Sequence, residues 1–318
     1  MSKLRIRKIA DWSGIGQFRK VLLFAEQVFL VGGVNPILGR RSNFKAIAVA
    51  IDIKNAKENW QIAMDKSYSF QQATILGNRL ILTIPNNFTH SFTGYIQVDI
   101  ESGKKETEHH FNDVILGAVS LGGKLFFGTA LRSKFRVFST ESEDQIDFPR
   151  PIDSRFWLLA ISAIENNKLV LTEYDHTLSR LTYTHSAFDL NGERLWRIDS
   201  DLANIASMDR QFLVWDRESA TAEAFDSKTG DLQSVVELAS PPLEIPIAIG
   251  EYGFTYACAD CSVHLRSWQG DDQEILRQPT SGSIALAYDK ATKTLVAAFS
   301  GNNNAPTTQV SLIELLGV

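Results

Sequence analysis

The sequence has few of the residues and motifs that identify a particular chemistry. It holds two cysteines, Cys258 and Cys261, among 318 residues, too few for a disulfide framework. No stretch approaches the roughly 18 apolar residues of a membrane span. The N-terminus carries basic residues but neither an apolar signal core nor a cleavage site. From these absences we expect a cytoplasmic protein that does not enter a membrane.

The chain also lacks a strong excess of charge of either sign. The net charge is −5 and the isoelectric point about 5.7, so the chain is mildly acidic. Proteins that bind nucleic acid regardless of sequence use a basic face, and we therefore expect no nucleic-acid partner. With 44% hydrophobic and 22% charged residues, the composition is that of an ordinary soluble globular protein.

Catalytic signatures are missing as well. There is no Gly-x-Ser-x-Gly nucleophile elbow, no phosphate-binding loop and no dinucleotide fingerprint. The run from Cys258 to His264 offers two thiols and an imidazole, but a structural zinc site needs four ligands and no second CxxC exists. The cluster Glu173–His176 is either an acid–base group or a polar loop. We read the cysteines as reduced thiols and predict no metal and no cofactor.

The chain does contain a regular repeat. Seven short apolar strands recur, each after a turn, with starts 51, 45, 44, 43, 42 and 41 residues apart. They begin at Val28, Arg79, Lys124, Lys168, Gln211, Gly253 and Thr294. Each has four to six residues rich in Val, Leu, Phe and Thr, as buried strands do. A constant period of this kind argues against two stacked β-sandwiches.

Each repeat contains four strands. An apolar strand precedes the marker strand, and a third strand, a tight polar turn and a fourth strand follow it. Glycines at Gly103, Gly192, Gly230 and Gly270 supply the positive φ that such turns need, with Ala56 in the same slot of the first repeat. Four strands per 40 to 50 residues predict an all-β, seven-bladed β-propeller of antiparallel blades.

The seven blades account for nearly the whole chain as a single domain. Their expected limits are 14–65, 66–112, 113–150, 151–200, 201–239, 240–279 and 280–318. The last unit lacks a fourth strand, whereas residues 3–10 form an orphan strand before the first unit. We therefore predict that the N-terminal strand completes the last blade, which would remove an exposed sheet edge.

The turn phrase AFDSKTGDL, residues 224–232, resembles the repeat of PQQ-like (quinoprotein-type) β-propellers, which are related to WD40-like propellers. That repeat has an Ala-x-Asp-x-x-Thr-Gly core followed by a tryptophan. The aspartates matching it are Asp52, Asp99, Asp189 and Asp226; the glycines are Gly103, Gly192 and Gly230; the tryptophans are Trp60 and Trp196. The resemblance implies that the aspartate and glycine shape the turn and that the tryptophan packs between neighbouring blades.

Departures from the quinone-dependent members place this chain on a cofactor-free branch. Those dehydrogenases usually have eight blades, a metal site and a pair of adjacent cysteines. Here seven blades are expected, and two residues separate Cys258 from Cys261. The resemblance therefore implies fold rather than chemistry.

A partner is expected on the face that carries the longer loops. The loops between second and third strands and those between blades open there, and the resemblance makes this the usual binding face. Arginine and aromatic residues, which dominate protein interfaces, gather in these loops. The candidates are Arg40, Arg41, Tyr68, Phe92, Arg132, Arg155, Trp157, His176, Arg180 and Arg217. The proline-rich loop SPPLEIP, from Ser240, is a further candidate.

We predict a non-catalytic protein–protein interaction module, either a scaffold subunit of a larger assembly or a specific inhibitor of the immunity type. The alternative is a hydrolase or lyase acting on a sugar or another small molecule at the central channel. That alternative predicts acidic residues and histidines that converge there with perturbed pKa values.

Overall fold

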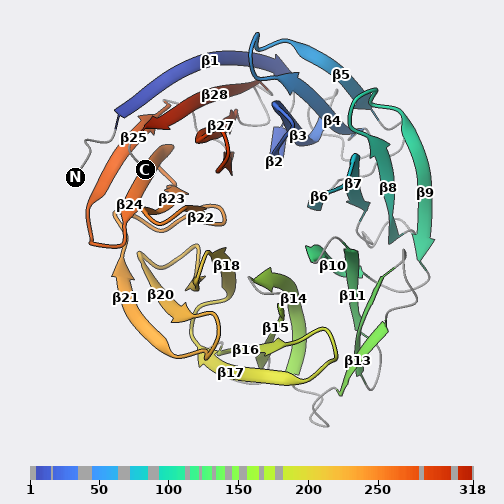
Figure 1. The fold of residues 1–318 in the computed structure, drawn as a ribbon, viewed down its shortest axis with the longest axis vertical. Coiled ribbons are helices and arrows are strands. Elements are labelled where there is room, and N and C mark those ends of the chain that lie inside the picture. The colour runs from blue at the N-terminus through green and yellow to red at the C-terminus, as the bar shows by residue number, and fades with distance from the viewer. Residues whose placement is uncertain are drawn as a thin grey trace.

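The computed structural model arranges the chain as a ring of seven sheets around a central axis (Figure 1). It describes residues 5–15, 17–34, 45–63, 72–84, 93–111, 115–121, 124–130, 134–139, 145–149, 156–164, 168–175, 182–278, 283–301 and 307–316. Every regular element in these ranges is a β-strand. None of the described ranges holds a helix long and apolar enough to cross a membrane.

Each of the first four blades is a four-stranded antiparallel sheet whose first strand lies innermost. Blade 1 is β2 (Gln17–Phe24), β3 (Gln27–Val34), β4 (Lys45–Asp52) and β5 (Glu58–Ala63); blade 2 is β6 (Gln72–Leu76), β7 (Arg79–Ile84), β8 (Thr93–Asp99) and β9 (Lys105–Phe111). Blade 3 is β10 (Ile115–Leu121), β11 (Lys124–Ala130), β12 (Lys134–Ser139) and β13 (Gln145–Pro149); blade 4 is β14 (Phe156–Ile164), β15 (Lys168–Asp175), β16 (Tyr183–Phe188) and β17 (Arg194–Ser200).

The remaining three blades complete the ring. Blade 5 is β18 (Asn204–Met208), β19 (Gln211–Trp215), β20 (Thr221–Asp226) and β21 (Leu232–Glu237); blade 6 is β22 (Ile247–Ile249), β23 (Gly253–Ala257), β24 (Ser262–Ser267) and β25 (Asp272–Arg277). Blade 7 is β26 (Ser283–Asp289), β27 (Thr294–Ser300), β28 (Thr307–Leu316) and the N-terminal strand β1 (Arg5–Ile15).

The predicted seven-bladed fold and its closure by the N-terminal strand are confirmed. Strand β1 pairs antiparallel with β28 from Arg5↔Leu316 to Ile15↔Thr307. It is longer than the expected 3–10 because the pairing continues beyond a bulge between Lys8 and Ala10. The two ends of the chain therefore share one blade, and the ring has no gap at the point where the chain begins.

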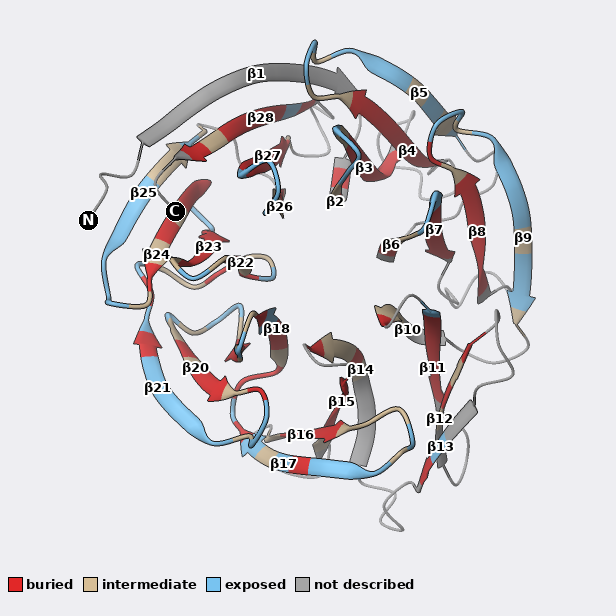
Figure 2. Ribbon diagram, viewed as in Figure 1, coloured by how far each residue is buried: buried red, intermediate tan, exposed pale blue. Residues whose placement is uncertain are grey.

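The core lies between the blades. The described residues form seven hydrophobic clusters, and each cluster joins two neighbouring blades. The marker strands are buried almost throughout because both of their faces pack against a neighbouring sheet, whereas the outer strands β5, β9, β21 and β25 are largely exposed (Figure 2). The apolar runs in the sequence thus correspond to strands covered on both faces.

An aspartate shapes the turn before the outer strand in several blades. The Oδ1 atom of Asp226 accepts hydrogen bonds from the backbone N–H groups of Lys228 and Thr229 at 2.8 and 2.9 Å. The carboxylates of Asp52, Asp99 and Asp189 accept equivalent bonds. Backbone bonds of this kind lower the pKa of Asp189 and Asp226, and the Ser102 hydroxyl followed by the Ser102 backbone N–H lowers the pKa of Asp99. Ala56, in the glycine slot of blade 1, adopts a φ of 52°.

Two tryptophans dock onto the turn of the next blade, as the resemblance implied. Trp60 Nε1 donates to the Ile100 carbonyl at 2.8 Å, and Trp196 Nε1 donates to the Ser227 carbonyl at 3.3 Å. A Cβ atom at Gly103 would lie 2.6 Å from the Trp60 ring, and one at Gly230 would lie 2.9 Å from the Trp196 ring. These glycines are needed both for positive φ and for the close approach of the indole.

The up-and-down order of strands divides the ring into two faces. One, the turn face, carries the turns between first and second strands and between third and fourth strands. The other, the loop face, carries the loops between second and third strands and the connections between blades. Backbone bonds such as Ile53 N to Glu26 O and Ser227 N to Arg210 O link the two kinds of turn on the turn face.

Candidate functional site

The structure describes few of the ten predicted partner-binding residues. Eight of them lie outside the described residues: Arg40, Arg41, Tyr68, Phe92, Arg132, Arg155, His176 and Arg180. Trp157 lies on the described backbone of β14, but its side chain is not described. Arg217, in the loop between β19 and β20, is fully described, and its environment defines the candidate site.

Arg217 contacts the connection between blades 5 and 6. Its NH2 atom lies 3.4 Å from Glu244 Oε1, and 62% of its side-chain surface is exposed. An exposed pair of this kind contributes at most about 1 kcal/mol to stability. The guanidinium therefore remains accessible to a partner while its position is held by the pair.

The connection that carries Glu244 is rigid. Three prolines fix its backbone, and the N–H of Leu243 donates to the Ala257 carbonyl at 2.8 Å. Pro242 forms a β-bridge with Cys258 at the end of β23. Ile245, next to Glu244, is 47% exposed although it is a large apolar residue. The loop thus presents an apolar side chain beside a charged pair on an ordered backbone.

A lysine on the innermost strand of blade 1 belongs to the same electrostatic environment. Burial lowers the pKa of Lys20 on β2, and the negative charge of Glu244 opposes that shift. Lys20 and Glu244 stand far apart in the sequence and on different blades, so the closed ring alone brings them within reach of each other.

Acidic residues flank Arg217 in the sequence. The N–H of Glu218 donates to Asp216 Oδ1 at 2.8 Å, which orders the loop. Partial burial raises the pKa of Tyr183, and the charges of Asp216 and Glu218 raise it further. The described part of the loop face therefore mixes both signs of charge with aromatic and apolar groups.

Blade 6 contains a serine, a histidine and an aspartate that contact one another in the same succession as a serine-hydrolase triad. Ser262 Oγ lies 3.0 Å from His264 Nε2, and His264 Nδ1 lies 2.9 Å from Asp272 Oδ1. However, Ser262 is wholly buried, and its hydroxyl donates to Asp260 Oδ1 at 2.5 Å. A nucleophile must reach a substrate, so this serine is a structural group. Tyr256 also donates to Asp272, at 2.6 Å.

Neither Cys258 nor Cys261 forms a disulfide, and both are buried. Burial raises the pKa of the Cys258 thiol to about 11, so it is protonated at neutral pH. His264 does not join them in a ligand set because both its ring nitrogens are hydrogen-bonded to Ser262 and Asp272. In the described part of the chain, no group of three or more His, Cys, Asp and Glu residues is placed to hold a metal ion.

A buried histidine fixes the start of the connection between blades 4 and 5. His185 is fully buried on β16, with Nε2 3.0 Å from the Leu202 carbonyl and Nδ1 3.0 Å from Thr172 Oγ1. A carbonyl only accepts, so Nε2 carries the proton and Nδ1 accepts from the threonine hydroxyl. Burial lowers the pKa of His185 to about 4.

The stability of the protein is therefore expected to fall with acidification through His185. The unfolded chain takes up this proton near pH 6.5, whereas the folded protein resists it down to about pH 4, so stability is complete above pH 6.5 and decreases as the pH falls to 4. We expect the wild type to lose about 3 kcal/mol more unfolding free energy between pH 7 and pH 4 than His185→Gln does. Urea unfolding at both pH values measures this difference. Equal pH dependence in the two proteins would contradict the assignment.

The sequence analysis did not single out Lys20, and it indicated Glu244 and Ile245 only as part of the proline-rich loop. Their roles depend on contacts between segments far apart in the sequence, which bring Glu244 close to Arg217 and within electrostatic range of Lys20. Only the proline-rich loop from Ser240 gave a usable signal, because its length and rigidity exceed what a blade connection needs.

Solved structures share this architecture. The crystal structure of BamB from Moraxella catarrhalis superposes with a TM-score of 0.56 at 15% sequence identity and covers 99% of both chains. The WD40 β-propeller domain of Doa1 gives a TM-score of 0.63 at 12% identity, over 98% of this chain and 97% of that one. These likenesses confirm the resemblance to PQQ-like and WD40-like propellers at the level of the fold. A scan against protein-family models finds no match, and neither does a search of curated proteins.

Proposed function

We propose that this protein is a non-catalytic interaction module that binds a protein partner on its loop face. The observation that carries the proposal is the Arg217–Glu244 pair beside the exposed Ile245, on a proline-stiffened loop. Arginine and apolar side chains on a preformed surface are the usual anchors of protein interfaces. A rigid surface also loses little conformational entropy on binding.

The charge pattern favours a protein over a nucleic-acid backbone. Arg217 pairs with the carboxylate of Glu244, and its two neighbours in the sequence, Asp216 and Glu218, are also acidic. A phosphate backbone would be repelled by these three carboxylates, whereas a protein surface can complement charges of both signs. With a net charge of −5, the chain suits a basic partner, either a companion subunit or a target that it inhibits.

Charge reversal at the centre of this site is expected to disrupt partner capture. In affinity capture of the tagged protein from its native cell, read by mass spectrometry, Arg217→Glu should retain less than about a tenth of the partner that the wild type captures. The new carboxylate would face Glu244 and would repel any group that recognises the guanidinium. Fold integrity is checked by an unchanged unfolding midpoint, since the pair is exposed.

The matched control is Lys228→Glu, the same charge change in the same blade but on the turn face. It should leave capture unchanged. If Arg217→Glu captured the partner as well as the wild type does, the proposed site would be wrong. If the folded wild type captured no protein at near-equal stoichiometry, the interaction-module proposal itself would fall.

A further inference from the structure

The junction between blades 5 and 6 lacks the docking tryptophan that closes two other junctions. Strand pairing sets Trp60 opposite Ala50, Trp196 opposite Ala187 and Ser234 opposite Ala224, so the three occupy equivalent places on their outer strands. Trp196 is buried, whereas Ser234 is exposed. The serine side chain is too short to cover the turn of blade 6.

The acceptor for an indole N–H is nevertheless present at this junction. Ile100, Ser227 and Trp268 are equivalent, because the backbone N–H of each bonds to the turn between the first two strands of its own blade. The carbonyls of Ile100 and Ser227 accept the indole N–H of the preceding blade. Among the residues that the structure describes, no hydrogen bond reaches the Trp268 carbonyl oxygen.

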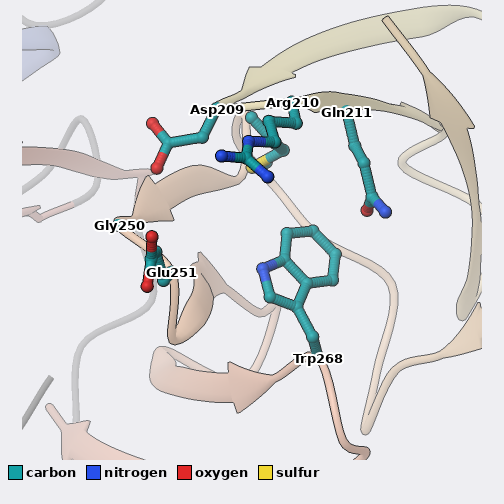
Figure 3. A pocket seen from close by; sticks show the side chains of 7 residues that line it. Asp209, Arg210, Gln211, Gly250, Glu251 and Trp268 are labelled. Carbon is teal, nitrogen blue, oxygen red and sulfur yellow. The ribbon is translucent and has the colours of Figure 1, made fainter.

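A cavity lies beside this position. Its volume is about 390 Å³, with Met208 and Gln211 from blade 5 and Trp268 from blade 6 among its lining residues. In Figure 3, Gln211 reaches in from one blade and the Trp268 ring from the next. Gln211 Oε1 is buried and has no hydrogen-bond partner. A Cβ atom built on Gly270 meets nothing within 4 Å, so the space beside the turn is open.

The cavity has an aromatic wall, the Trp268 ring, and two hydrogen-bond acceptors without a donor among the described residues, the Trp268 carbonyl and Gln211 Oε1. An aromatic side chain that carries an N–H group would pack on the Trp268 ring and satisfy an acceptor that now has no partner. At its rim, Asp209 is 3.5 Å from Lys290, while Glu251 and Arg210 are exposed. The exposed carboxylates of Glu251 and Asp271, the latter beside Gly270, favour a basic residue next to the aromatic one.

We infer that the junction of blades 5 and 6 is a docking slot for a tryptophan side chain of a partner polypeptide, flanked by a basic residue. The chain itself shows the fit, because its own indoles occupy two equivalent junctions and donate to two equivalent carbonyls. The inference rests on the proposed function for its biological occupant, but it concerns the opposite face of the ring. It names a second anchor point, separate from Arg217.

A peptide titration tests the slot directly. The probe is acetyl-Gly-Trp-Lys-Gly-amide, and the control peptide has leucine in place of tryptophan. Binding is followed by NMR, through the backbone amide signals of Trp268 and Gly270 and the side-chain amide signal of Gln211. We expect the tryptophan peptide to bind with a Kd of about 1 mM. The leucine peptide should bind at least about tenfold more weakly, because it offers neither an aromatic face nor an N–H donor.

Two variants distinguish the slot from a general apolar surface. Ser234→Trp places a tethered indole at the vacant position, and its high effective concentration should exclude the peptide and weaken binding at least about tenfold. Thr107→Trp, at the equivalent position of blade 2, should leave binding unchanged. Absence of shifts at Trp268 and Gly270, equal binding of the leucine peptide, or undiminished binding to Ser234→Trp would each overturn the inference. None of these outcomes bears on partner capture at Arg217.

Discussion

Replacing Trp196 with alanine is expected to lower the free energy of unfolding by about 3 to 5 kcal/mol, the usual cost of truncating a buried aromatic residue. Trp196 is 7% exposed and joins two blades. Its ring stacks on Phe212 of the next blade, with centroids 4.9 Å apart and planes 3° apart. Alanine would leave a cavity at that contact and remove one of the bonds to the Ser227 carbonyl. Equilibrium urea unfolding measures the loss.

Phenylalanine at the same position separates the two contributions. Trp196→Phe keeps an aromatic ring against Phe212 but has no N–H for the Ser227 carbonyl, so it should cost about 1 kcal/mol plus a small loss of packing. A change below about 1 kcal/mol for Trp196→Ala would show that the indole does not hold the two blades together.

Deleting residues 1–15 is expected to change the oligomeric state of the protein as well as its stability. Strand β28 would lose its outer neighbour along Thr307–Leu316 and present a row of unpaired backbone groups. Such an edge invites pairing with another chain. We expect the truncated protein to leave size-exclusion chromatography as oligomers or aggregates and to unfold at a lower temperature than the full chain.

A circular permutant provides the matched control. Arg5 pairs with Leu316, so the two ends of the described chain are already adjacent. Joining Val318 to Met1 and opening the chain between Ile15 and Gln17 keeps all four strands of blade 7 and changes only the connectivity. The permutant should leave size-exclusion chromatography at the wild-type volume and unfold at nearly the wild-type temperature. A truncated protein that behaves the same way would show that three strands suffice for this blade.

The sequence was sufficient for the architecture because the structural signals repeat at short range. Marker strands such as that at Gln211 are apolar since both faces are covered, and the turn before each outer strand is fixed by a local bond such as Asp226 to Lys228. Seven imperfect copies of one pattern outweigh the irregularity of any single copy. The closure of the ring could be predicted because the last repeat lacked its fourth strand and the N-terminal strand belonged to no repeat.

The candidate sites were harder to predict for a physical reason. Arg217 could be chosen from its residue type and loop, but nothing in the sequence pairs it with Glu244 or sets Lys20 of blade 1 within electrostatic range of that carboxylate. The slot at Trp268 exists because blade 5 has Ser234 where blades 1 and 4 have a tryptophan. The repeats are degenerate, so this absence could be recognised only after strand pairing showed which positions are equivalent. The binding roles assigned to the other nine loop-face residues remain predictions.

Because blade 7 combines β1 with β26, β27 and β28, the ring can close only after β28 has been synthesised. Strand β1 leaves the ribosome about 300 residues before its hydrogen-bonding neighbour β28, because β1 ends at Ile15 and β28 ends at Leu316. At about 5 to 20 residues per second, β1 waits roughly 15 to 65 seconds for its partner. A chain that terminates before β28 leaves β1 without its strand partner. The closing strand pair therefore forms only in chains that have been translated through β28.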